Sequence, residues 1–179
     1  GGLTGDFWRS ISRPCAPSND PADEFGEGKI FRPNRDVRFS ADKSPYKTNC
    51  AARLGLGYVS FALDGLSVGS GLYMPDAGQL QRFRAAVDAE ETGGQLVGIV
   101  EKLHNDGYQT MALDVLKTAP KGYPKDHPRI ELLRHKGIAM MRTWPVGEWL
   151  ATNKAKDKVV TTLRAAVPLN EWLAANVGL

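Results

Sequence analysis

Two runs in which apolar residues alternate with small or polar ones, joined by Asp64-Gly65, constrain the fold of this chain more than any other feature. An Asp-Gly pair suits a two-residue type I′ turn, because both central positions of that turn require a positive φ. We therefore predict a β-hairpin with strands at 57–63 and 66–73. Counting outward from the turn places one set of side chains on a single face, which we expect to be the core face: Val59, Phe61, Leu63, Leu66, Val68 and Ser70.

The opposite face of the predicted hairpin is made mostly of small residues. Glycine within a strand is typical of a bulge, or of the close approach of another backbone or a ligand. Close packing of a helix on this face is the interpretation that we favour over a ligand. The residues concerned are Tyr58, Ser60, Ala62, Ser67, Gly69 and Gly71.

Helices are expected after the hairpin. Capping boxes at Asp76/Gln79 and Thr92/Gln95 predict two helix starts. A short helix should have Pro128 in its first turn and end before Gly137, and a C-terminal helix should begin near Asn153 and resume at Pro168. Strands linked by a hairpin and followed by helices indicate an α+β fold, with a mainly antiparallel sheet and packed helices.

The chain divides by composition into a short arm and one domain. Residues 1–28 are rich in proline and polar residues and lack an extended apolar period, so we expect a flexible N-terminal arm. Residues 29–179 should form a single α+β domain. No apolar run reaches the roughly 20 residues that a membrane span needs, and two cysteines make no disulfide framework. We therefore expect no membrane association and a cytoplasmic location.

Charge is concentrated in one segment. The net charge is only +3, but residues 29–53 contain seven basic and two acidic side chains. Guanidinium groups bind phosphate or carboxylate through paired hydrogen bonds, and lysine adds a compact charge. An aspartate could orient an arginine, and a tyrosine could donate a hydrogen bond. We therefore predict a binding site for a phosphate- or carboxylate-bearing small molecule at Arg32, Arg35, Asp36, Arg38, Lys43 and Tyr46.

Two other interpretations of the basic segment stay open. The same residues could form an internal ion-pair network without a ligand. They could also bind nucleic acid, with Phe39 and Tyr46 as stacking platforms, although the modest net charge counts against this. No phosphate-binding glycine loop occurs, and the three histidines lack metal-ligand spacing. We therefore expect no cofactor and no metal, and the sequence identifies no catalytic residue.

Two weaker candidates lie elsewhere. The loop 121–127 brings Tyr123, Lys125, Asp126 and His127 onto one turn, where functional residues are common. Capping of the following helix by Asp126 is the alternative that we favour. Cys50 follows the basic segment and could be a nucleophile, but a half-buried structural thiol is the safer interpretation.

The basic segment also resembles a family signature. Residues 32–46 fit the pattern RxxRDxRFxxxKxxY, which resembles the bacterial family of uncharacterised proteins catalogued as domain of unknown function 2461. The resemblance continues through 68–73, 121–128 and 132–136 and covers roughly 24–177. It implies that the motif matters but implies no reaction. Members usually have a longer helical region before the signature. A shortened region here could expose apolar surface, through which the chain could form a homodimer.

Overall fold

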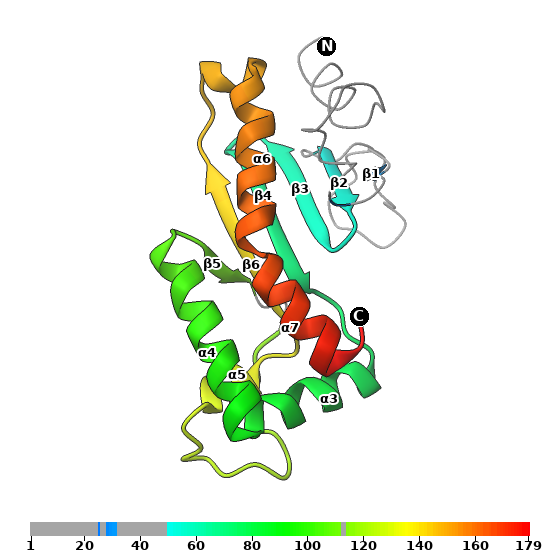
Figure 1. The fold of residues 1–179 in the computed structure, drawn as a ribbon, viewed down its shortest axis with the longest axis vertical. Helices are drawn as coiled ribbons and strands as arrows, with labels where there is room; N and C mark the ends of the chain where they lie inside the picture. Colours follow the sequence, from blue (N-terminus) through cyan, green and yellow to red (C-terminus); the bar gives the residue numbers. More distant parts are fainter. Residues whose placement is uncertain (1–24, 26–27, 32–49, 112–113) are drawn as a thin grey trace, which may run out of the picture. The chain divides into compact units, whose positions relative to one another are not determined.

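A computed structural model describes residues 25, 28–31, 50–111 and 114–179 of the chain (Figure 1). Within this part a six-stranded sheet has the order β1-β2-β3-β4-β6-β5, and the strand pairs are antiparallel. Packed helices complete an α+β fold, which confirms the predicted fold class. The strands are β1 (Gly28–Ile30), β2 (Cys50–Leu54), β3 (Gly57–Ala62), β4 (Gly65–Leu72), β5 (Gln109–Met111) and β6 (Ile138–Trp144).

In the described part, helices occur after β4, between β5 and β6, and after β6. Helices α3 and α4 come between β4 and β5, and α5 precedes β6. After β6 come a 3-10 turn, η1, and the two C-terminal helices. Their bounds are α3 (Ala77–Asp88), α4 (Glu90–Asn105), α5 (Ile130–Arg134), η1 (Glu148–Ala151), α6 (Asn153–Ala165) and α7 (Val167–Val177).

The chain forms two compact units. Of the described residues, the first contains those up to Val68 together with Thr143–Leu163, and the second contains those from Gly69 to Arg142 and Arg164–Leu179. Strands β4 and β6 and helix α6 each continue from one unit into the other. The predicted arm at 1–28 falls almost entirely outside the described residues, so its separation from a domain at 29–179 stays a prediction.

The core of the first unit lies between the sheet and α6. Val59, Leu66 and Val68 point inward from β3 and β4 and are fully buried. They pack with Val159 and Leu163, which lie one helical turn apart on α6. The period of two in the strands and of about four in the helix thus supplies complementary apolar faces.

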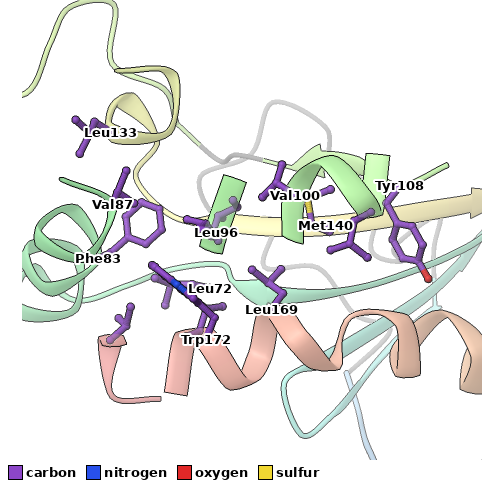
Figure 2. Close-up of a cluster of buried hydrophobic side chains, with 14 residues drawn as sticks. Leu72, Phe83, Val87, Leu96, Val100, Tyr108, Leu133, Met140, Leu169 and Trp172 are labelled. Atoms are coloured by element: carbon purple, nitrogen blue, oxygen red, sulfur yellow. The ribbon is translucent and has the colours of Figure 1, made fainter. Parts of the chain in front are cut away.

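The core of the second unit is built from helices α3, α4, α5 and α7 and parts of β4 and β6 (Figure 2). Phe83 of α3 and Trp172 of α7 meet edge to face, with ring centroids 6.2 Å apart. The Trp172 indole N–H donates to the carbonyl of Thr92 at 2.9 Å, so its polar group is satisfied where the ring is buried. Leu96 and Leu133 are fully buried in the same cluster.

The hairpin is present, but its turn differs from the prediction. Leu63 and Asp64 lie between the strands, and Leu63 is 91% exposed, so its expected place in the core is wrong. Gly65 is instead the first residue of β4, with φ of +136°. A Cβ there would overlap the carbonyl oxygen of Trp144. Gly65 is therefore required by the approach of β6 as well as by the turn.

The remaining predictions for the hairpin divide between its two faces. Val59, Leu66, Val68 and Ser70 are buried as expected. On the small-residue face, a Cβ at Gly69 would lie 2.6 Å from the Met140 carbonyl oxygen, and one at Gly71 would overlap that of Ile138. The close neighbour at these two glycines is thus the backbone of β6 and not a helix, so the favoured interpretation of this face is wrong.

One of the two predicted capping boxes is confirmed. The Asp76 side chain accepts from Gln79 N, and the Gln79 side chain accepts from Asp76 N. The box at Thr92 is wrong, because α4 begins earlier, at Glu90, and the Thr92 hydroxyl donates to the carbonyl of Ala86. The C-terminal helices begin as predicted, at Asn153 and with Pro168 in the first turn of α7.

We predict that Gly65→Ala lowers the free energy of unfolding by at least about 2 kcal/mol. The added Cβ would combine an unfavourable φ with overlap of a backbone carbonyl, and each such strain costs on the order of 1–3 kcal/mol. Urea denaturation measures the change. The matched control is Gly94→Ala in α4, where a Cβ meets open space, and where we expect a gain of about 0.5–1 kcal/mol. Equal effects of the two substitutions would show that a Cβ at Gly65 is not strained by its φ and by the carbonyl of Trp144.

Candidate functional site

The predicted anion site lies outside the described residues. This holds for every member of the set Arg32, Arg35, Asp36, Arg38, Lys43 and Tyr46, so the site stays a prediction. The described residues on either side show how that segment is attached. Ile30 pairs with Ala52, and Phe31 N donates to Ala51 O at 2.8 Å. The motif therefore joins two neighbouring antiparallel strands, β1 and β2.

A row of polar side chains crosses the three strands next to the motif. The register pairs Lys29 of β1 with Arg53 of β2, and Arg53 with Tyr58 of β3. Because Leu54 and Val59 are buried on the core face, alternation places this row on the other face. We call Lys29, Arg53 and Tyr58 the basic row.

The basic row has a fixed arginine and an aromatic neighbour. Arg53 Nε donates to Gly55 O at 2.7 Å, which orients the guanidinium group, and the side chain is exposed. The rings of Phe31 and Tyr58 lie with their centroids 6.4 Å apart. Neither Lys29 nor Arg53 forms a salt bridge with a carboxylate of the described residues. The row can therefore offer two cations and an aromatic surface to an anion.

The loop that carries Tyr123 and His127 is held against the end of α3. His127 Nε2 lies 3.1 Å from Asp88 Oδ1, and His127 Nδ1 accepts from Arg129 N at 3.0 Å. Since Nδ1 is an acceptor, this hydrogen-bond pattern assigns the proton of the neutral ring to Nε2. Both ring nitrogens are thus occupied, and His127 positions the loop without a nitrogen left for a base or a metal ligand.

Arg129 donates hydrogen bonds to the C-terminal end of α3. Its Nε donates to Val87 O at 2.7 Å, and its Nη2 donates to Asp88 O at 2.8 Å. Both terminal nitrogens also lie 3.1 Å from Glu90 Oε2, although Glu90 is 92% exposed and that ion pair contributes little. The side chain of Arg129 is only 9% exposed. It therefore satisfies carbonyls that a helix end leaves without donors.

The favoured role of Asp126 is wrong. The N-cap of α5 is Arg129, and no side chain caps that helix. The N-cap falls three residues after Asp126. Ile130 N donates to His127 O, so a turn at 127–130 precedes the helix. Asp126 is an exposed residue of the loop.

The other histidines and the cysteine have local structural settings. His104 Nε2 bonds to the Thr110 hydroxyl at 2.8 Å. His135 is half-buried, and its Nδ1 has no hydrogen-bond partner within the described part. Cys50 is half-buried and packs against the core of the first unit, which fits the structural interpretation of its thiol. Among the described residues, no three histidine, cysteine or acidic side chains are grouped as metal ligands.

Sequence reasoning missed the basic row. Lys29 and Arg53 belong to the segment whose excess charge we noted, but the site prediction left both out. In strand β2 the apolar residues Ala52 and Leu54 flank Arg53, and this apolar-polar-apolar order could have placed Arg53 on the outer face. The pairing of Lys29 with Arg53 depends on the register of β1, and three residues are too few to predict a register.

The chain matches the model of a known protein family. The model of the family described as conserved hypothetical protein (DUF2461) matches residues 8–172. That range includes the motif, the basic row and the loop at 121–129. The comparisons with curated proteins and with solved structures found no match. No helix of the described residues is long and apolar enough to cross a membrane.

We predict that Arg129→Ala lowers the free energy of unfolding by about 2–4 kcal/mol. The substitution leaves the carbonyls of Val87 and Asp88 without their donor, and each such loss costs about 1–3 kcal/mol. Urea denaturation measures the effect. Lys125→Ala, on the exposed part of the same loop, serves as the control and should change stability by less than about 0.5 kcal/mol. A loss of stability no larger than that of the control would show that the hydrogen bonds from Arg129 contribute little.

We also predict that His135 makes the protein less stable in mild acid. Burial lowers the pKa of His135; the charge of Glu131 opposes this shift, and that of Arg134 adds to it. The unfolded chain therefore takes up a proton near pH 6.5 before the folded protein does, so stability falls as pH decreases below about 6.5. Urea denaturation at pH 7.5 and pH 5 should show a smaller loss for His135→Gln than for the wild type. His104→Gln controls for loss of an imidazole as such, and equal losses in wild type and His135→Gln would contradict the prediction.

Proposed function

The chain belongs to the family of conserved hypothetical proteins (DUF2461), and from that premise we propose that it binds a phosphate- or carboxylate-bearing small molecule. The binding groups of this proposal are the guanidinium groups, the lysine and the phenol of the motif, with an aspartate that orients one arginine. They are Arg32, Arg35, Asp36, Arg38, Lys43 and Tyr46. A bacterial cytoplasm, where such anionic metabolites are abundant, is the location that we infer.

The observation that carries the proposal is the register of the first three strands. It aligns Lys29, Arg53 and Tyr58 in one row, on the strands to which both ends of the motif are attached. The row and the motif are therefore neighbours along the chain and share the sign of their charge. An anion that approaches the motif would also be attracted by the cations on these strands.

Charge supports the same conclusion. The segment 29–53 has a net charge of +5 from seven basic and two acidic residues. Like charges held close together repel one another, and an anion relieves that repulsion while guanidinium groups bind it through paired hydrogen bonds. The aromatic pair Phe31 and Tyr58 lies beside Arg53 on the same part of the sheet and can pack against the apolar part of such a ligand.

The experiment is a thermal-shift screen with inorganic phosphate, pyrophosphate, citrate, sugar phosphates and nucleotides. A ligand at 100 times its dissociation constant should stabilise the protein by about 2.7 kcal/mol. We expect Arg38→Ala to abolish the shift and Arg53→Ala to reduce it. Lys102→Ala, on an exposed face of α4, is the charge-matched control and should leave the shift unchanged.

Two results would overturn the proposal. If no anion shifts the midpoint, and Arg38→Ala alone lowers stability by several kcal/mol, the motif is an internal ion-pair network. If instead the protein retards oligonucleotides and the affinity falls steeply with salt, the motif is a nucleic-acid interface.

A further inference from the structure

A short antiparallel pairing holds the segment that leads from β5 toward α5. Residues 114–116 lie against residues 134–136, with Val115 directly opposite His135. Two backbone hydrogen bonds, of 2.8 Å and 3.0 Å, flank this pair. We call the two paired segments the latch, because they hold the start of the loop that continues to Arg129.

Side chains reinforce both backbone hydrogen bonds of the latch. Leu116 N donates to Arg134 O, and Arg134 Nε donates back to Leu116 O at 2.6 Å. Lys136 N donates to Asp114 O, and Lys136 Nζ forms an ion pair with the Asp114 carboxylate. Each outer residue of the first segment is thus bound by the main chain and by the side chain of its partner.

The imidazole of His135 lies at the centre of the latch. When hydrogen bonds flank an antiparallel pair in this way, the two opposite side chains are close together, so Val115 lies beside the ring. The ring is half-buried, and its Nδ1 is buried without a hydrogen-bond partner among the described residues. A charged imidazole carries a proton on both nitrogens, so its Nδ1–H would be buried without an acceptor. Burial of such a donor costs free energy.

The carboxylates of the surrounding elements are already paired with cations. Glu131 is the only acid of α5, and its Oε1 lies 3.1 Å from Arg134 Nη1. Asp114 is the only acid of the latch, and it pairs with Lys136. Neither carboxylate is therefore free to offset a positive charge on the ring of the latch.

Charges and burial together favour the neutral ring in the closed latch. Arg84 of α3 donates to a carbonyl of α5 at 3.3 Å, so the cations of the surrounding elements outnumber the carboxylates. Burial lowers the pKa of His135; the charge of Glu131 opposes this shift, and that of Arg134 adds to it. In an open latch the ring would be in water and would take up a proton near pH 6.5.

We propose that the latch is an acid-sensitive switch that opens when His135 is protonated. Residues 114–116 then separate from residues 134–136, and the start of the loop is released. The other end of the loop stays bound to α3, because Arg129 donates there to two carbonyls, which do not titrate. The opening is local, so it is distinct from global unfolding in acid, and it does not rest on the function proposed for the motif.

The expected size of the effect follows from proton linkage. The open state binds a proton as the pH falls below about 6.5, and the closed state binds it only at lower pH. Acid therefore favours the open state. Between pH 7.5 and pH 5.5 the equilibrium constant for opening should rise by up to about tenfold.

Native-state hydrogen exchange of the full chain measures this opening. The reporters are the amides of Leu116 and Lys136, with labelling times corrected for the pH dependence of intrinsic exchange. We expect their protection to fall several-fold, up to about tenfold, from pH 7.5 to pH 5.5, while amides of α4 and α7 keep theirs. Equal protection of the reporters at both pH values would overturn the proposal, as would its loss only together with that of α4 and α7.

Substitutions assign the effect to one ring. His135→Gln cannot be charged and should abolish the pH dependence at the reporters. His104→Gln removes an exposed imidazole from α4 and, as the matched control, should behave like the wild type. Asp114→Asn removes the partner of Lys136, so it should lower protection at both pH values and keep the pH dependence. A pH dependence that persists in His135→Gln would overturn the proposal.

The pH profile of the wild type is a second test, which needs no substitution at His135. Opening should be constant above about pH 7 and should begin to rise near pH 6.5, where an exposed imidazole titrates. A rise that begins only near pH 4 would assign the transition to a carboxylate and would contradict a switch at this histidine.

Discussion

The backbone of β6 comes so close to β4 that three positions of β4 have no room for a Cβ. Gly65 meets the carbonyl of Trp144, Gly69 that of Met140, and Gly71 that of Ile138. β4 and β6 are neighbouring interior strands of the sheet, and each contributes side chains to both cores. Any side chain at these glycines would push the strands apart, so the spacing on which both cores depend is set by the absence of side chains.

This constraint explains which parts of the fold the sequence could predict. The alternation in β3 and β4, the Asp76 capping box and the helix start at Asn153 are local patterns, and the structure confirms them. The partner of the glycine face was not predictable, because β6 is about 70 residues away and nothing local identifies it. Leu63 was misplaced for a related reason. A turn one residue earlier than the one that Asp64-Gly65 favours moves Leu63 from a strand into the solvent-exposed connection.

The candidate sites show the same division between local pattern and long-range pairing. Charge composition alone identified the segment around the motif, whereas the alignment of Lys29 with Arg53 appears only once the register of β1 and β2 is known. Likewise, the sequence grouped Tyr123 and His127 on one loop but could not place Asp88 beside them. The role of His127 follows from its partners, since an imidazole with both nitrogens bonded is a structural group whatever its neighbours in sequence.

Charge is arranged differently in the two parts of the molecule that carry the candidate residues. Around the motif, one sign of charge dominates, and a ligand is expected to bring the opposite sign. On α3 both signs are present, and their partners lie within the second unit: Asp88 lies 3.1 Å from His127 Nε2, and Arg84 donates to the carbonyl of Leu133. These contacts join α3 to the loop at 121–129 and to α5, so the charged side chains there serve to hold elements of the second unit together.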